Sequence, residues 1–292
     1  MHSRYQPWLF LAPALILVVV VTIYPFAYSL YISFHDVELT NIRKVPFVGF
    51  ENYLKLLGDR AFHLSLLRSI YFVVGTVAGS FIVGFGLALL LDLEVKGMVV
   101  LRSLIIVPMV VTPVSIGLTW RMMYSNQIGV INYVLGLVGL PQPLWIQSPD
   151  TALVSVMLVD IWEWSPFMFL ILLAGLRSLP VSPSESARVD GANAWQRFLF
   201  LTLPMMKPVI VVALILRTVD AMRIFDQIFV MTRGGPVQAT DLFSLFLYRI
   251  GFKHSHISYA AALSWILLLL STLMLVLFVR QTGIFKPKDA AE

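Results

Sequence analysis

Six long apolar segments, separated by shorter polar stretches, dominate the chain. About 20 apolar residues in a helix are enough to cross the ~30 Å hydrocarbon core of a bilayer, at about 1.5 Å per residue. The pattern therefore predicts an all-α, polytopic membrane protein with six transmembrane helices. The predicted helices cover residues 8–34, 65–91, 103–124, 151–176, 205–231 and 259–279.

Proline and glycine refine this prediction. The first segment is too long for the apolar core of a signal peptide, so we expect an uncleaved first helix. Prolines predict kinks in the first and third helices, at Pro13, Pro25, Pro108 and Pro113. Gly75 and Gly79 form a G-x-x-x-G pattern, which permits a close helix approach in a membrane.

The connecting segments are polar and rich in glycine and proline. Residues 35–64 predict an external loop followed by a short amphipathic helix from Glu51, and residues 125–150 an outer loop with a short helix. Residues 237–258 predict another outer loop. We expect three regions: 1–64, with the first helix and its external loop; 65–280, with the transmembrane core; and a tail at 281–292.

Composition supports the membrane assignment and excludes several functions. Of 292 residues, 59% are hydrophobic and 13% charged, against about 45–50% and 25% in soluble domains. There is no cysteine, so thiolate metal sites are excluded. The chain has no phosphate-binding G-x-x-x-x-G-K-[ST] motif and no H-E-x-x-H motif. His254 and His256 are too isolated to predict a metal site, and a net charge of +5 suits lipid headgroups better than nucleic acid.

A polar stretch at 182–204 separates the fourth and fifth apolar segments. Ser182, with Pro183 next to it and Glu185 three residues later, predicts a capped short helix. Gly191 suits a left-handed exit from that helix. A second short helix would lead to Pro204 and the next segment. From spacing alone, this could be an amphipathic connector on the membrane surface.

The same stretch resembles the coupling loop, or EAA motif, of the membrane subunits of ABC importers. The family pattern is Glu-Ala-Ala, then Asp-Gly-Ala, then an aromatic residue and Leu-Pro. The matching positions are Glu185, Ala187, Asp190, Gly191, Ala192, Phe198, Leu203 and Pro204, with Ser186 in place of the middle alanine. The resemblance implies a cytoplasmic coupling helix that docks in a cleft of an ATPase subunit. The sequences at 48–53 and 234–236 also resemble those of sugar-importing members of the family.

The fifth segment carries four charged residues that alternate in sign at three-residue spacing: Arg217, Asp220, Arg223 and Asp226. A charge at mid-membrane costs a few kcal/mol or more, so such residues face the protein interior or a wet cavity. One interpretation is a self-neutralising ladder of i,i+3 pairs. The other is that some of these groups line the transport path and bind substrate hydroxyls, with Asp220, Arg223 and Asp226 as candidates.

Trp162-Glu163-Trp164 in the fourth segment suggests a similar choice. A carboxylate can accept sugar hydroxyls, and indole rings can stack on the apolar faces of sugars. The structural alternative is that the tryptophans face lipid or pack against other helices, and that Glu163 pairs with Arg217 or Arg223. We name Trp162 and Glu163 as candidate substrate contacts. The run from Trp162 to Phe169 also resembles the fourth span of carbohydrate permeases. In maltose-type members, asparagine is common at the fifth-span position of Arg223. The charge of Arg223 therefore leaves the identity of the substrate open, and a phosphorylated substrate is compatible with it.

The resemblance implies a permease subunit of a carbohydrate-uptake ABC importer in a bacterial inner membrane. It implies a second homologous permease, two ATPase subunits that hold ATP and Mg²⁺, and an external binding protein, with no cofactor in this chain. Two other classes compete: an ion-coupled secondary transporter, and a membrane-embedded enzyme. The first is disfavoured because we find no inverted repeat. The second is disfavoured because no nucleophile–base pair is evident.

Charge bias does not settle the orientation. With the coupling loop inside, ten lysines and arginines lie in cytoplasmic segments and nine in external ones. The positive-inside rule needs a clear excess. The expectation that both termini are cytoplasmic therefore rests on the resemblance.

Overall fold

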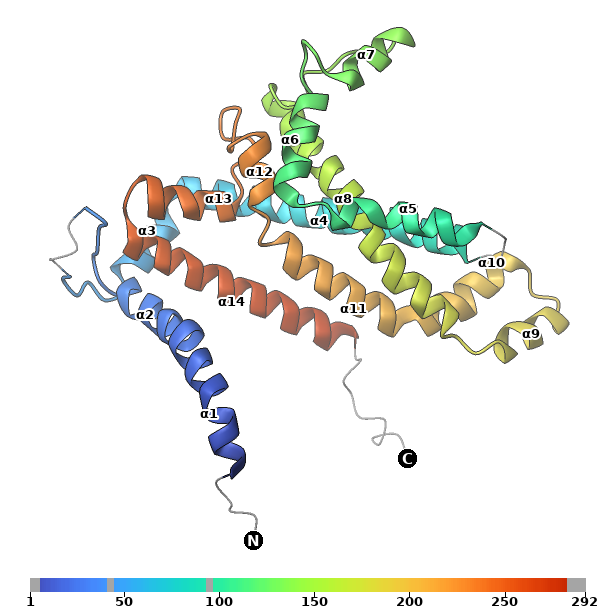
Figure 1. The fold of residues 1–292 in the computed structure, drawn as a ribbon, viewed down its shortest axis with the longest axis horizontal. Helices are drawn as coiled ribbons and strands as arrows, with labels where there is room; N and C mark the ends of the chain where they lie inside the picture. Colours follow the sequence, from blue (N-terminus) through green and yellow to red (C-terminus); the bar gives the residue numbers. More distant parts are fainter. Residues whose placement is uncertain (1–5, 41–44, 93–96, 283–292) are drawn as a thin grey trace. The chain divides into compact units, whose positions relative to one another are not determined.

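A computed structural model describes residues 6–40, 45–92 and 97–282. The described chain is helical throughout, apart from turns, loops and two isolated β-bridges. Five helical stretches are long and apolar enough to cross a membrane, and a bent helix pair makes a sixth if it is counted as one span. The all-α membrane prediction is confirmed (Figure 1). Most of the expected tail lies outside the described residues.

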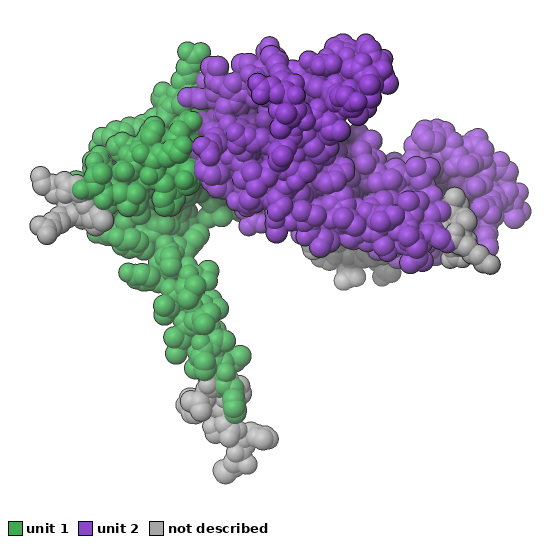
Figure 2. All heavy atoms as spheres, turned by 45° about the horizontal axis from the view of Figure 1, so that its top comes forward, with its two compact units in different colours: residues 1–63, 246–272 green, residues 64–245, 273–292 purple. Residues whose placement is uncertain are grey.

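The chain divides into two compact units, coloured separately in Figure 2. Unit 1 comprises residues 1–63 and 246–272, and unit 2 comprises residues 64–245 and 273–292.

Unit 1 contains the first span, built from α1 (Gln6–Val18), the π-helical segment η1 (Val19–Ile23) and α2 (Tyr24–Ser33). Its most apolar window has no buried residue, so its surface is free to face lipid or another chain. α2 packs against α14 (Ile257–Thr282), where the Phe26 and Trp265 rings meet at a tilt of 53° with centroids 4.5 Å apart. The short helix expected from Glu51 is α3 (Glu51–Gly58), and Asn52 on it donates to the carbonyls of Ser33 and His35 at the end of α2.

The expected outer loop at 237–258 is partly wrong. It contains α13 (Phe243–Tyr248) and the π-helical segment η3 (Arg249–Lys253). The helical turn forms because Leu242, Phe243 and Phe246 are almost completely buried, and apolar burial outweighs the polar composition of the surrounding residues.

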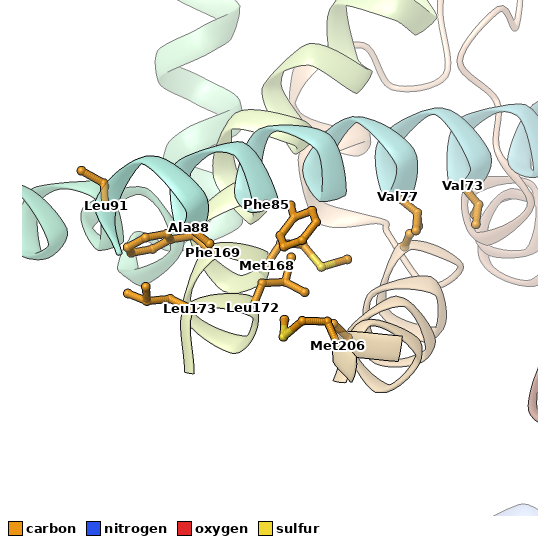
Figure 3. Close-up of a cluster of buried hydrophobic side chains, with 12 residues drawn as sticks. Val73, Val77, Phe85, Ala88, Leu91, Met168, Phe169, Leu172, Leu173 and Met206 are labelled. Carbon is orange, nitrogen blue, oxygen red and sulfur yellow. The ribbon is translucent and has the colours of Figure 1, made fainter. Parts of the chain in front are cut away.

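Unit 2 is centred on α4 (Arg60–Leu91) from residue 64 on, α8 (Pro149–Arg177) and α11 (Leu203–Ala221). Their apolar faces form one core, drawn in Figure 3, to which α4 contributes Phe85, α8 contributes Phe169 and α11 contributes Met206. The expected close approach of α4 is confirmed: added methyl groups at Gly75 and Gly79 would clash with α8 side chains.

The third span is bent far more sharply than a proline kink. α5 (Met98–Val110) and α6 (Pro113–Met123) meet at 94°. Val111 and Thr112 are extended between them, and for Thr112 this is expected because it directly precedes Pro113. α7 (Val130–Leu137) is the short helix expected in the following outer loop.

The predicted fifth span, 205–231, is wrong at both ends. Helix is continuous from α10 (Ala194–Arg197) through the π-helical segment η2 (Phe198–Thr202) into α11, and it ends at Ala221. α12 (Asp226–Met231) is a separate helix. The sequence suggested that a new helix begins at Pro204. Instead, α11 continues directly from η2, so Pro204 lies inside a helix that begins at Ala194.

Candidate functional site

Two interrupted helices lie side by side in unit 2. α6 follows the break in the third span, α12 follows the break after Ala221, and these two short helices pack along each other. The Arg121 guanidinium on α6 donates to the carbonyl of Val230 on α12 across 3.1 Å. The Ser244 hydroxyl donates to the carbonyl of Ile224 inside the second break. Non-helical backbone at membrane depth requires such partners or a water-filled cavity.

A cavity of about 290 Å³ lies where these breaks meet the continuous helix α8. It is lined by Pro113 from α6, by Asp160, Glu163 and Trp164 from α8, and by Asp220, Arg223, Ile224, Phe225, Asp226 and Gln227 around the second break. Most lining side chains are polar, so the cavity suits a hydrophilic solute with one apolar face.

A buried arginine ties two of the surrounding helices together. Arg217 on α11 forms ion pairs with Asp160 on α8 and, at 3.0 Å, with Asp220 one turn along its own helix. The side chains of Arg217 and Asp160 are 0% and 1% exposed. The guanidinium also lies over the Trp164 ring, 5.3 Å from its centroid. Arg217 therefore neutralises charge behind the cavity wall and supports the indole that lines it.

Glu163 pairs with an amide. Gln227 donates from Nε2 to the Glu163 carboxylate across 3.0 Å, which joins α8 to α12. Both side chains are buried, and Oε1 of Gln227 has no hydrogen-bond partner within the described chain. The alternative that Glu163 pairs with Arg217 or Arg223 is not seen: Glu163 bonds to Gln227, and Arg217 is paired with two aspartates.

Four of the five predicted substrate contacts line the cavity: Glu163, Asp220, Arg223 and Asp226. Trp162 does not line it; this ring is 43% exposed and meets Trp120 edge to face, with centroids 5.4 Å apart. Only the first rung of the predicted ladder, Arg217 with Asp220, forms. The second rung is missing because α11 ends at Ala221 and breaks the helical spacing.

Sequence reasoning missed Asp160 and Gln227 as lining residues, and it considered Trp164 without naming it among the candidate contacts. Helical spacing could have found Asp160, since it lies three residues before Glu163 and four before Trp164, on one helix face. Gln227 carried no signal, because only the helix break brings it to Glu163.

The predicted coupling segment forms a protruding helical turn. α9 (Ser182–Val189) is followed by Asp190 and then Gly191, whose φ of +84° is left-handed, as expected. The N–H of Ala192 bonds to the carbonyl of Ala187 at 2.9 Å, and that of Gly191 to Arg188 at 3.1 Å, the two bonds of a Schellman motif. Of the predicted coupling residues, Glu185, Ser186, Asp190 and Gly191 are exposed, whereas Ala187 and Ala192 are half-buried.

The expected capping box was placed wrongly. Ser182 is the first helical residue, and no side chain caps α9. The capping box lies at α10, where Asn193 accepts from the N–H of Gln196, and the Gln196 side chain accepts from the N–H of Asn193, both at 2.9 Å. α10 therefore has the defined start, and it continues into α11.

Comparison with known proteins identifies the family. A family model described as "Binding-protein-dependent transport system inner membrane component" matches residues 80–288. The chain belongs to this family. It is thus a membrane-embedded transport subunit and not an enzyme, with ATP hydrolysis on a separate chain. Family membership therefore decides against the two competing classes, the secondary transporter and the membrane enzyme.

Several relatives match over most of their length. The trehalose/maltose transport system permease protein MalF of Thermococcus litoralis is 39% identical over 82% of this chain and 81% of its own. The sulfoquinovosyl glycerol permease SmoG of Agrobacterium fabrum is 35% identical, and the trehalose permease SugA of Mycobacterium tuberculosis is 32% identical; each match covers 98% of this chain and 92% of the relative.

Solved structures share the fold. A bacterial ABC transporter that imports the acidic polysaccharide alginate gives a TM-score of 0.82 at 20% identity, over 97% of this chain and 96% of that one. The same kind of alginate transporter, in complex with its alginate-loaded periplasmic protein, gives 0.80 at 22% identity over 95% and 94%. At this identity the likeness concerns the fold.

Proposed function

We propose that this chain is one of two permease subunits of an ATP-driven importer that moves a sugar or polyol by alternating access. Relatives named for trehalose, maltose and sulfoquinovosyl glycerol support a carbohydrate substrate. The observation that carries the proposal is the polar cavity at the two helix breaks. Transporters commonly place their binding sites at such interruptions near mid-membrane.

In this proposal the cavity residues bind substrate. The carboxylates of Glu163, Asp220 and Asp226 accept substrate hydroxyls, and Arg223 donates to a hydroxyl or ring oxygen. Trp164 takes the stacking role because its indole lines the cavity and is held from behind by Arg217. Contact with Trp162 stays a prediction without support from the cavity.

The coupling residues Glu185, Ser186, Ala187, Asp190, Gly191 and Ala192 would dock in the partner ATPase. Their route to the cavity is one continuous helix, from Ala194 to Ala221. At about 1.5 Å per residue this helix spans ~42 Å. Its last turn carries Asp220, and Arg217 ties it to α8. ATP-driven displacement of the coupling turn would therefore move the cavity wall directly.

The remaining parts of the proposal concern assembly. A second, homologous permease would complete the pore, two ATPase subunits would hold ATP and Mg²⁺, and an external binding protein would deliver substrate. This chain would hold no cofactor and bind no nucleic acid. Residues 65–280 would form the transport core, preceded by the first helix with its loop at 1–64 and followed by a cytoplasmic tail at 281–292.

The test of this assignment is purification of the tagged chain together with the chains encoded beside it. We expect an ATPase and a second permease to co-purify, with hydrolysis stimulated by a sugar-loaded binding protein. Uptake into proteoliposomes would then require ATP and all components. A chain that purifies alone and transports without nucleotide would contradict the proposal.

Orientation has its own test. The chain has no cysteine, so a single introduced one is the only reactive thiol. We propose that both termini and α9 face the cytoplasm, and that the loop after Pro236 faces outward. Ser186→Cys should react with a membrane-impermeant maleimide only after permeabilisation, whereas Gln238→Cys should react in intact spheroplasts. The reverse pattern would invert the topology.

A further inference from the structure

Hydrogen-bond acceptors greatly outnumber donors on the cavity wall. Four carboxylates line it: Asp160, Glu163, Asp220 and Asp226. Outside ion pairs, the donors among the lining side chains are the Arg223 guanidinium, the Trp164 indole and the Gln227 amide, which already donates to Glu163. Arg217, behind the wall, is paired with two aspartates. A solute in this cavity therefore meets mostly acceptors.

The charge of the wall points the same way. Four lining carboxylates face two guanidiniums, Arg223 in the wall and Arg217 behind it, which leaves a formal charge of −2. A proton on Glu163 would leave it at −1. Asp226 and Arg223 are both exposed to the cavity and form no ion pair within the described chain.

Gln227 adds an independent observation. Its side chain is 1% exposed, and its Nε2 group donates to the Glu163 carboxyl group. Because Nε2 faces Glu163, Oε1 is left as a buried acceptor with no partner among the described residues. A buried amide oxygen left unsatisfied is unfavourable, and a donor from the solute would relieve it.

We infer that the cavity selects a solute rich in hydrogen-bond donors and free of anionic groups: a neutral polyhydroxy compound or an amine-bearing sugar. The inference rests on the proposed function, which it makes more specific. An anionic group offers only acceptors and would find one free guanidinium among four carboxylates. This selection would separate the chain from importers of sulfonated or uronic-acid sugars.

The experiment uses the reconstituted complex of both permeases, ATPase and binding protein in proteoliposomes. The probe is an equimolar pool of size-matched saccharides: neutral (trehalose, maltose, glucose), amine-bearing (glucosamine, trehalosamine) and anionic (sulfoquinovosyl glycerol, glucuronate, glucose 6-phosphate). Internalised solutes are identified by mass. We expect neutral or amine-bearing members to enter at least tenfold faster than anionic ones.

Variants separate the cavity from the binding protein, which stays unchanged. Asp226→Asn removes one exposed charge and should lower the ratio of neutral to anionic uptake by roughly threefold or more. Asp150→Asn is the matched control, an exposed aspartate at the start of α8 outside the cavity, and should leave the ratio unchanged. An Asp226→Asn ratio equal to wild type would overturn the charge argument.

Gln227→Leu tests the orphan acceptor. It should raise the KM for the preferred solute about tenfold while kcat changes less, since the lost contact is a binding contact. Gln142→Leu, an exposed glutamine in the outer loop, is the matched control. If the Gln227→Leu chain does not assemble with the ATPase, the uptake ratio of Asp226→Asn alone tests the inference. The Asp226 side chain is exposed, so its replacement should not disturb packing.

The outcomes are distinguishable. Preferred uptake of an anionic member overturns this inference and leaves a sugar importer standing. Uptake of no saccharide of any class means that the proposed function fails, and the inference falls with it.

Discussion

Arg217 on α11 forms an ion pair with Asp160 on α8, and both side chains are shielded from solvent. Removing one partner of a buried pair leaves an uncompensated charge, which costs about 3–5 kcal/mol, whereas replacing both by neutral groups is often tolerated. This pair therefore helps to fix α11 to α8, together with the apolar core that the two helices share.

We expect Arg217→Met to lower the thermal stability of the assembled complex, by about 3–5 kcal/mol, and Asp160→Asn combined with Arg217→Met to recover part of it. Thermal unfolding in detergent measures both. Arg177→Met is the control: Arg177 pairs with Asp92 at 3.3 Å, but both side chains are more than 40% exposed, so the loss should be below about 1 kcal/mol. Equal losses in the two single variants would contradict the burial argument.

Gly191 should be indispensable to coupling because of its backbone. A β-branched side chain at φ +84° costs roughly 1–2 kcal/mol, although the space around Gly191 is open. Gly191→Val should therefore reduce sugar-stimulated ATP hydrolysis at least several-fold, while substrate capture by the external binding protein is unchanged. Gly139→Val imposes similar strain at φ +71° in the loop after α7 and should leave coupling intact. Normal stimulation in Gly191→Val would show that the Schellman turn is not needed.

Gly84 lies where α4 touches the backbone of α8. A methyl group there would lie 2.8 Å from the amide nitrogen of Phe169 and the carbonyl of Ser165, neither of which can rotate away. Gly84→Ala should lower the free energy of unfolding by 1 kcal/mol or more, in the range ~1–3 kcal/mol for overpacking. Gly86→Ala, on the same helix with open space around it, should be neutral or stabilising by up to about 1 kcal/mol. Measured unfolding that ranks the two variants in the opposite order would refute the predicted close approach.

The start of α10 should depend on its capping box. Asn193→Ala removes the acceptor for the Gln196 N–H and should cost about 1 kcal/mol of local stability. Hydrogen exchange should then accelerate several-fold at Gln196 and Arg197. Ser182→Ala should leave exchange in α9 unchanged, because no side chain caps that helix. Faster exchange in α9 after Ser182→Ala would restore the cap that the sequence suggested.

Local rules predicted much of the fold. Apolar length located the membrane helices, and the left-handed requirement at Gly191 appeared in the backbone as expected. The G-x-x-x-G pair on α4 also met its partner helix. These features depend on residues close together in the sequence, so a pattern contains the information.

The errors arose where tertiary contacts decide. No local signal ends α11 at Ala221, since neither glycine nor proline occurs from there to Met231, and the break is held by the remote Ser244. Because that break was missed, the ladder was extended to Asp226 and the Glu163–Gln227 pair was not foreseen. Four cavity residues were still predicted, because a charge inside a membrane requires a polar environment wherever the helix ends.

The uninterrupted helix from Ala194 to Ala221 has an evolutionary consequence. In the proposed mechanism the element that receives force from the ATPase also carries part of the selectivity wall, so substrate range and energetic efficiency are not independent traits. A mutation that reshapes the wall to admit a new solute also alters the mechanical element, and it risks ATP turnover without transport. Adaptation to a new substrate would then require two kinds of change in this one helix. The first would allow the substrate to be transported, and the second would suppress ATP hydrolysis without transport.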